Sequence, residues 1–338
     1  MGDVAADPSR PFDLLVVGEV NADVIVADPD PRPTFGQAER LVRDIRPAVG
    51  SSSVITACAA ARLGLSVAMV GVVGDDLFGR FMLDAMRERG VDVSSVRVAG
   101  DAPTGASVIL TDGRDRAILT ARGTIGAVTA EDVPAALLRK ARHLHIGSWF
   151  LQDGLRPDAI ALLRAAREAG LTTSLDPNWD PSGRWDDGLT AVLPWLDLVF
   201  PNDTEVSRIA GFDDPEVAAA ELARLGRPGT AAAGSSGAGS SGTGSLVVVK
   251  CGADGAFAAT ADGVVARVGP YPVTALDTTG AGDTFDAGFL AAWLAGAAPI
   301  DALRAGAVAG AISTTALGGV DGQPTRPALD AALQGWAS

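Results

Sequence analysis

The sequence has few of the residues on which disulfide-stabilised or nucleic-acid-binding proteins depend. Its 338 residues include two cysteines, Cys58 and Cys251, each in apolar surroundings. Two isolated cysteines exclude a disulfide framework and fit a reducing cytoplasm. Lys and Arg number 27 against 41 Asp and Glu, which gives a net charge of -14. Such an acidic surface argues against a nucleic acid or an anionic membrane as the partner.

Three sequence signals are also missing. No stretch approaches 18 uncharged apolar residues, so we expect no membrane-spanning segment. The N-terminal run MGDVAADPSRP has no basic start followed by an apolar stretch, so we expect no signal peptide and a cytoplasmic protein. No G-x-x-x-x-G-K-[ST] run occurs, which argues against a P-loop enzyme.

The chain is rich in apolar runs that alternate between strand and helix patterns. Hydrophobic residues make up 47% and charged residues 20%, as in globular proteins with a large core. We expect strands at 12–17, 67–71, 143–146, 172–175, 198–200 and 246–250. We expect helices at 52–64, 77–89, 157–169, 215–225, 284–294 and 308–317. This alternation predicts an α/β fold in three layers, with helices on both faces of a mainly parallel sheet.

Two regions depart from that alternation. Extended runs at 24–27, 39–48, 104–111 and 116–122 predict a small separate β-sheet, with Asp112-Gly113 as a hairpin turn between the last two. Residues 226–245 are low in complexity and predict a flexible loop. A G-x-G-x-x-G run at 237–242 follows a helix and precedes a strand, the reverse of a dinucleotide-binding fingerprint.

The most informative run is residues 277–289, DTTGAGDTFDAGF. Gly280, Ala281 and Gly282 are small residues at the start of an apolar helix, where backbone N–H groups and the helix dipole favour an anion. Asp283 at the mouth of this cradle is suited to accept a proton from an attacking hydroxyl. The alternative is a glycine-rich turn whose aspartate caps a helix.

This run resembles the C-terminal signature of the PfkB (ribokinase-like) carbohydrate kinases, and residues 71–79 (GVVGDDLFG) resemble a second turn of that family. The resemblance implies one kinase domain over 1–338, a ribokinase-like core and a β lid from segments 24–48 and 104–122. It also implies transfer of the γ-phosphoryl group of ATP to a hydroxyl of a small carbohydrate. Asp283 would be the base, and the backbone from Gly280 to Asp283 the anion hole.

The resemblance also assigns residues to the sugar. Asp23 corresponds to the aspartate that grips sugar hydroxyls, a task suited to a carboxylate, although a turn aspartate is the alternative. Gly50, Ser51 and Ser52 occupy the place of the family's sugar loop. Ile55 stands where an asparagine is usual, which leaves the identity of the sugar open.

On the nucleotide side, the chain departs from the family pattern at one position. The run from Asp176 to Asn178 resembles the D-x-N-x-R motif, but Asp180 replaces the arginine, and Arg184 is a candidate substitute. Glycines after the last predicted strand would let that loop approach the nucleotide closely. By resemblance, four residues would bind ATP: Asn178, Lys250, Gly252 and Gly255.

Two pairs of residues are candidate metal ligands. Asn202 and Glu205 match the family's N-x-x-E motif and fall one helical turn apart, where oxygen ligands would suit Mg²⁺ on the ATP phosphates. The alternative for this pair is an ordinary N-cap with a capping glutamate. Asp277 and Thr279 correspond to positions that bind a monovalent cation in many relatives, so potassium is a candidate cofactor.

Several alternatives remain open at this point. The substrate could be a hexose, ribose, a keto-deoxy sugar acid such as 2-keto-3-deoxygluconate, or a nucleoside. A different class is a non-catalytic nucleotide-sensing or scaffold protein, because fold does not fix function. The small lid sheet needs a second surface against it, and the resemblance implies a homodimer built from the lids.

Overall fold

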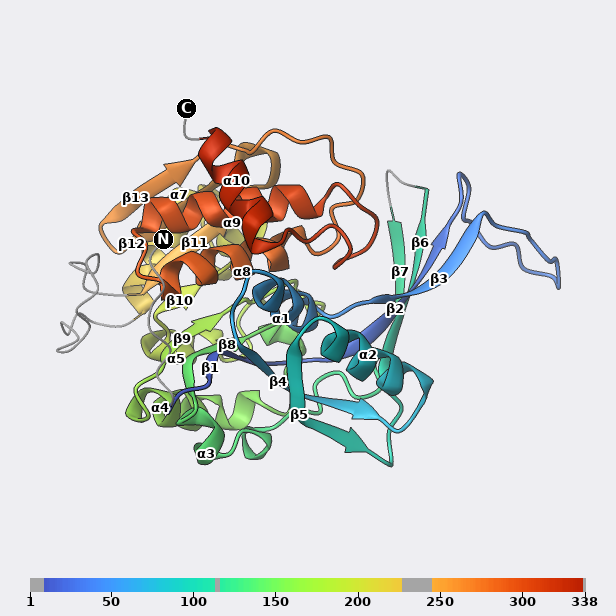
Figure 1. The fold of residues 1–338 in the computed structure, drawn as a ribbon, viewed down its shortest axis with the longest axis horizontal. Helices are drawn as coiled ribbons and strands as arrows, with labels where there is room; N and C mark the ends of the chain where they lie inside the picture. The colour runs from blue at the N-terminus through green and yellow to red at the C-terminus, as the bar shows by residue number, and fades with distance from the viewer. Residues whose placement is uncertain (1–8, 113–115, 227–244, 337–338) are drawn as a thin grey trace.

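The computed structural model describes residues 9–112, 116–226 and 245–336. The low-complexity segment at 227–244, with its G-x-G-x-x-G run, and Gly113 of the predicted hairpin turn lie outside these residues. Figure 1 shows a helix-covered core with a β-sheet projecting from one side. Among the described residues, no helix is both long enough and apolar enough to cross a bilayer.

The core is built on a nine-stranded sheet in the order β13-β12-β11-β10-β9-β8-β1-β4-β5. Neighbours from β11 to β5 run parallel, whereas β12 and β13 pair antiparallel at one edge. The strands are β1 (Phe12–Val17), β4 (Val67–Gly74), β5 (Val91–Ala99), β8 (Ala141–Ile146), β9 (Thr172–Leu175), β10 (Leu198–Val199), β11 (Leu246–Lys250), β12 (Ala256–Thr260) and β13 (Gly263–Val268).

Helices cover both faces of this sheet, as the apolar strands require. Along β1, Leu14 and Val16 pack into one cluster while Leu15 and Val17 pack into the other. The first face carries α1 (Ser52–Arg62), α2 (Leu77–Glu88), α8 (Ala281–Leu294), α9 (Pro299–Ser313) and α10 (Arg326–Trp336). The second carries α3 (Ala135–Leu138), α4 (Ala159–Glu168), α5 (Leu189–Val192), α6 (Asp203–Ala210) and α7 (Pro215–Leu225).

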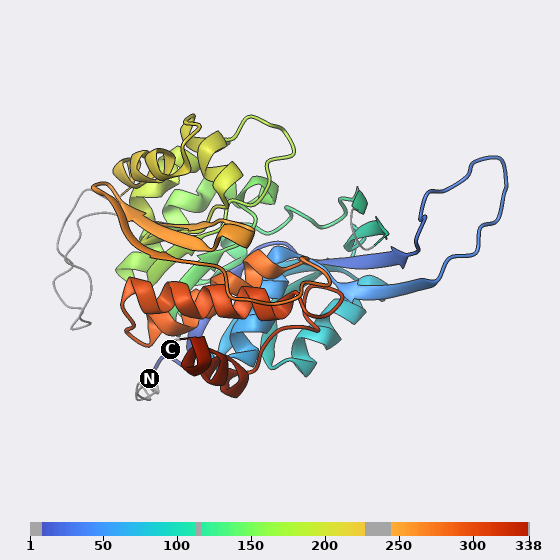
Figure 2. The ribbon, with the colours of Figure 1, turned by 90° about the horizontal axis from the view of Figure 1, so that it is seen from above.

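The second sheet has four strands in the order β3-β2-β6-β7 and is the lid. It consists of β2 (Asn21–Ala27), β3 (Asp44–Val49), β6 (Gly105–Thr111) and β7 (Arg116–Ala121). Figures 1 and 2 show these strands extending away from the core helices. The sequence therefore predicted the lid correctly, with strand ends shifted by a few residues.

The structure also corrects several predicted elements. The helix expected at 308–317 is α9, which begins at Pro299 and ends at Ser313. Helix α8 begins at Ala281, so Asp283 lies within its first turn and not before it. Strands β5, β12 and β13 were not predicted. The three-layer α/β/α architecture with a mainly parallel sheet and a β lid was predicted correctly.

Candidate active site

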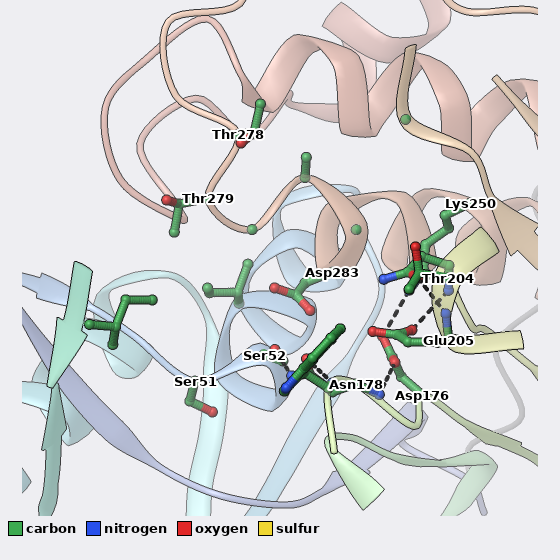
Figure 3. Close-up of a pocket in the computed structure, with 18 of the residues that line it drawn as sticks. Ser51, Ser52, Asp176, Asn178, Thr204, Glu205, Lys250, Thr278, Thr279 and Asp283 are labelled. Carbon is green, nitrogen blue, oxygen red and sulfur yellow. Dashed lines mark hydrogen bonds and ion pairs between the residues drawn. The ribbon is translucent and has the colours of Figure 1, made fainter. Parts of the chain in front are cut away.

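A cavity of about 610 Å³ lies where the lid meets the carboxyl ends of the parallel strands. Ligands bind at this edge in open α/β sheets because the loops that follow successive strands converge there. The cavity is lined from three sides by the lid strands, the start of α8 and the loops after β9, β10 and β11. Figure 3 shows Asp283 between the Thr278–Thr279 loop on one side and the Glu205–Lys250 side on the other.

The start of α8 depends on glycine. Gly280 is the N-cap in the left-handed region at φ 72, and a Cβ there would lie 2.8 Å from the carbonyl oxygen of Gly319. Ala281 and Gly282 follow as the first helical residues and line the cavity. The first N–H groups of a helix have no partner within it. That of Ala281 donates to Thr278 O at 3.3 Å, which leaves those of Gly282 and Asp283 available to an anion at this end.

Asp283 lies in the first turn of α8 and lines the cavity. Burial, together with the neighbouring Asp176 carboxylate, raises the pKa of Asp283 to about 7. Lys250 and a hydrogen bond from Ser52 act in the opposite direction. A carboxyl group that titrates near neutrality is matched to general-base work.

Asp23 lies on lid strand β2, is 8% exposed and lines the same cavity as Asp283. Burial raises the pKa of Asp23 to about 7, and the lid residue Arg116 opposes this increase. Gly50 makes room for this carboxylate, because a Cβ at Gly50 would lie 2.4 Å from Asp23 Oδ1. The structure therefore brings the predicted sugar residues and the predicted base to one cavity, which Ser51 and Ser52 also line.

Glu19, which the sequence reading did not single out, holds the sugar loop in place. Its buried carboxylate accepts hydrogen bonds from Ser51 Oγ at 3.1 Å and Ser53 Oγ at 2.6 Å. Ser148 Oγ donates to it at 2.9 Å and Gln152 Nε2 at 3.0 Å. These donors tie the loop before α1 to the end of β8. The sequence did offer one signal for Glu19, because it is an acidic residue just after the buried strand β1.

Asn178 links the predicted sugar and nucleotide sides. It adopts a left-handed backbone at φ 55, and its side-chain amide donates to Ser52 Oγ at 2.8 Å and to Ser148 Oγ at 3.0 Å. Asn178 also lines the cavity, so its predicted ATP contact stays a prediction. Asp180 is buried and accepts hydrogen bonds from Ser182 Oγ and from the backbone of Ser182 and Trp185.

Arg184 does not take the place of the arginine missing from the D-x-N-x-R motif. It is exposed and pairs with Asp187 at 2.6 Å, and it does not line the cavity. The suggestion that Arg184 contacts phosphate is therefore wrong. The loop places this guanidinium beside an acidic neighbour three residues on, which sequence spacing alone did not reveal.

Lys250 ends β11, and its ammonium group is already bound by protein. Nζ lies 2.8 Å from Asp176 Oδ2 and 3.2 Å from Asp286 Oδ2. Burial alone would lower the pKa of Lys250, but Asp176, Asp286 and Glu205 together raise it, so the side chain stays charged. Lys250 also lines the cavity, so its expected contact with the ATP phosphates stays a prediction.

The two glycines after Lys250 differ in position. Gly252 lines the cavity at φ 54 with open space where a Cβ would be. Gly255 packs against β13, where a Cβ would lie 2.1 Å from the carbonyl oxygen of Val268, and it does not line the cavity. The expected nucleotide role of Gly255 stays a prediction, and the structure shows that its missing side chain allows a close approach to β13.

Asn202 and Glu205 line the cavity at the start of α6. Asn202 Oδ1 accepts the backbone N–H of Glu205 at 2.8 Å, and Glu205 Oε2 accepts that of Asn202 at 2.8 Å. This is the capping arrangement named above as the alternative. Burial and the nearby Asp176 raise the pKa of Glu205 to about 7. Capping leaves lone pairs on both side chains, so a second role in holding metal-bound water is compatible with it.

The predicted monovalent-cation pair lies beside the anion cradle, in contact with the lid. Asp277 Oδ1 accepts hydrogen bonds from Thr279 N at 2.9 Å and Thr279 Oγ1 at 2.7 Å, and Oδ2 accepts from Gly318 N at 2.8 Å. Thr279 Oγ1 also accepts from Arg116 Nη1 of lid strand β7 at 2.7 Å. Arg116 therefore joins the lid to the loop that leads into α8.

Comparison with known proteins agrees with this geometry. Residues 12–326 match the model of the pfkB family carbohydrate kinases. The chain is 32% identical over 321 residues to an ATP-dependent ribose-1-phosphate kinase of Halopiger xanaduensis, covering 94% of this chain and 96% of that one.

Two solved structures share the fold. A ribokinase II from E. coli in complex with ATP and Mg²⁺ superposes with a TM-score of 0.79 at 23% identity, covering 96% of this chain and 99% of that one. A fructokinase double mutant from Vibrio cholerae, with fructose, ADP and potassium bound, has a TM-score of 0.77 at 25% identity. That match covers 97% of this chain and 100% of the fructokinase.

Proposed function

Because this chain belongs to the pfkB family of carbohydrate kinases, and so is an ATP-dependent sugar kinase with a hydroxyl group as acceptor, we propose that Asp283 is its catalytic base. The observation that carries the proposal is the placement of Asp283 at the start of α8, in the cavity that also contains Asp23. The proposal has both carboxyl groups contact one bound sugar, Asp283 from the core and Asp23 from the lid.

In this proposal, Asp23 accepts hydrogen bonds from sugar hydroxyls and turns the acceptor hydroxyl towards Asp283. Ionised Asp283 takes the proton from that hydroxyl as its oxygen attacks the γ-phosphorus of ATP, and the bond to the β-phosphate oxygen breaks. The N–H groups at the start of α8, from Gly280 to Asp283, stabilise the charge on the migrating phosphoryl group. Positioning and electrostatics therefore supply most of the rate enhancement.

Mg²⁺ and potassium fit the residues present. Asn202 and Glu205 offer oxygen atoms at the cavity wall, which is the ligand type that Mg²⁺ prefers. When bound, Mg²⁺ would offset charge on the ATP phosphates. Asp277 and Thr279 offer oxygens beside the cradle for a monovalent cation, and the potassium-bound fructokinase supports testing potassium here.

A substrate panel tests this proposal. ADP release is measured with ATP and Mg²⁺ against ribose, ribose 1-phosphate, fructose, 2-keto-3-deoxygluconate and a nucleoside, with and without potassium. We expect one of these acceptors to stimulate ADP release far above the rate with ATP alone, and the phosphorylated product to be detected by mass spectrometry. ATP binding with no acceptor-dependent turnover across the panel would instead favour the nucleotide-sensing alternative.

We also propose that the protein is a homodimer built from its lids. Ser107, Ile109 and Ile118 line the cavity, so their strand neighbours point to the opposite face of the sheet. That outer face is apolar and open: Ile45 is 62% exposed and Leu119 66%. A sheet of four strands with one open apolar face is suited to pairing with a second copy.

A further inference from the structure

Lys250, Asp176 and Asp286 form a buried cluster beside the proposed anion hole, and Lys250 and Asp176 also line the cavity. The side chains of Lys250, Asp176 and Asp286 are 13%, 7% and 0% exposed. Nζ lies 2.8 Å from Asp176 Oδ2 and 3.2 Å from both oxygens of Asp286. The three residues come from the end of β11, the end of β9 and the second turn of α8, so the cluster joins three elements at one point.

This cluster lies directly against the start of α8. A Cβ at Gly282 would lie 3.6 Å from Lys250 Nζ and 3.7 Å from its Cδ and Cε, so the lysine side chain packs against this glycine. Asp286 follows Asp283 by three residues and therefore projects from a neighbouring position on the same side of the helix. Fixing Asp286 fixes the rotation of α8 about its axis, and with it the direction of the Asp283 side chain.

The ammonium group is poorly suited to leave this cluster for a bound nucleotide. It has three donors, and they are directed at two carboxyl groups that lie within the protein. Turning Lys250 towards ATP would leave the buried Asp176 carboxylate without its cation, and an unpaired buried charge is strongly unfavourable. Burial raises the pKa of Asp286 well above its usual value, whereas Lys250 lowers that of Asp176, so Asp176 is the charged partner of Lys250 and Asp286 a neutral one.

We propose that Lys250 is a positioning residue that holds Asp176 and Asp286, and through them keeps Gly282 and Asp283 in place for phosphoryl transfer. The inference rests on the proposed function and goes beyond it, because it replaces the expected phosphate contact of Lys250 with a contact to α8. A phosphate ligand and a positioning residue affect different kinetic constants. Loss of a phosphate ligand weakens ATP binding, whereas loss of positioning slows the chemical step.

The test compares Lys250→Met, Asp286→Leu and the double variant with the wild type. We expect each single variant to lose roughly 10- to 100-fold in kcat, the scale of a small misplacement of catalytic groups, with the Kd and KM for ATP within about threefold of wild type. We expect the double variant to be no slower than the slower single variant, because the two residues act as one unit. Asp286→Leu is decisive on its own if Lys250→Met does not fold. If Lys250 is a phosphate ligand, Asp286→Leu frees its ammonium group and tightens ATP binding. If Lys250 is a positioning residue, Asp286→Leu lowers kcat.

Arg142→Met is the matched control. Arg142 ties the other end of α8 to the core through Leu294 O at 2.8 Å and Asp13 Oδ1 at 2.8 Å. We expect that control to lower the melting temperature and to leave kcat within about threefold of wild type at 25 °C, since it lies far from the first turn of α8. A kcat loss as large as that of Lys250→Met would show that any loosening of α8 suffices and would overturn the proposal.

Two further outcomes separate this proposal from the proposed function. If the wild type is active but Lys250→Met raises the Kd for ATP tenfold or more with kcat retained, Lys250 is a phosphate ligand and the positioning proposal is wrong. If the wild type transfers no phosphoryl group to any acceptor while binding ATP, the proposed function fails and the positioning proposal fails with it.

Discussion

At the scale of single residues, the site is defined by buried carboxyl groups whose pKa values are shifted by burial and by neighbouring charges. Asp283, Glu205 and Asp23 all have a pKa raised to about 7, in each case first of all by burial. Asp176 is the exception: Lys250 and hydrogen bonds outweigh burial and lower its pKa. Of these four carboxyl groups, that of Asp176 is ionised and the other three titrate near neutrality.

This predicts the pH dependence of the reaction. Only ionised Asp283 can accept a proton, and its pKa is raised to about 7, so kcat should rise as pH increases through about 7 and reach a plateau above it. Because Glu205 titrates in the same range, Glu205→Gln is the control, and the acid limb should persist in that variant. Steady-state rates of both enzymes between pH 5.5 and 9 would measure this pH dependence of kcat. A kcat that stays level down to pH 5.5 would contradict the role of Asp283.

The sequence could identify Asp283 but not the buried charged residues that surround it. Asp283 lies in a contiguous motif whose small residues and helix start carry their own chemical meaning. The partners of Lys250 are 74 and 36 residues away in the chain, and nothing in the local pattern indicates that these charges meet. Asp286 lies inside an apolar helical run, and its local sequence assigns it no role. Arg184 was misread for the same reason, since only the folded loop places it beside Asp187.

At the scale of elements, the best predicted segments are those with clear turn signals at both ends. Strands β9 and β11 and helix α7 were predicted to the residue. Strand β5 was missed because it carries polar residues such as Ser94 and Ser95 at the edge of the sheet. Helix α9 begins earlier than the helix predicted at 308–317, because Pro299 is a favourable first helical residue and the apolar run already starts there.

The lid is the element whose role is most open to direct test. Arg116 on β7 donates to Thr279 Oγ1 at 2.7 Å, so it holds the lid against the loop before α8. We expect Arg116→Met to raise the KM for the sugar by roughly tenfold, the factor of one charge-assisted hydrogen bond.

The control for this prediction is Arg46→Met. Arg46 lies on lid strand β3, pairs with Asp44 at 3.7 Å and does not line the active-site cavity. Initial-rate measurements over a range of sugar concentrations would separate the two variants. Equal sugar KM values for Arg116→Met and the wild type would show that the contact to Thr279 does not help to close the lid.

At the scale of the whole molecule, an acidic protein has an exposed apolar face on its lid. The protein carries a net charge of -14, yet the outer face of the lid exposes apolar side chains. Val108 pairs with Leu119 across β6 and β7 on that face, and Val26 pairs with Ile45 across β2 and β3. A second copy that covers these residues would remove this surface from water.

We therefore expect Leu119→Glu to convert a dimer into a monomer. A charge placed at the centre of an apolar interface is unfavourable on both copies at once because the interface is two-fold. Val265→Glu is the control, since Val265 is 52% exposed on β13, the edge strand of the core sheet. Light scattering at micromolar protein should give a dimer mass for the wild type and Val265→Glu. A monomer mass for the wild type would refute the lid dimer.

The most direct test of the account as a whole is Asp283→Asn, assayed with the acceptor that the substrate panel identifies. Asparagine keeps the shape of aspartate but cannot take a proton, so we expect kcat to fall by at least ~10², the usual range for a general base, with the Kd for ATP nearly unchanged. The melting temperature, measured alongside, should not fall, because a buried carboxyl group with a raised pKa is replaced by a neutral one. Turnover close to wild type in a folded Asp283→Asn enzyme would contradict the mechanism proposed for this site.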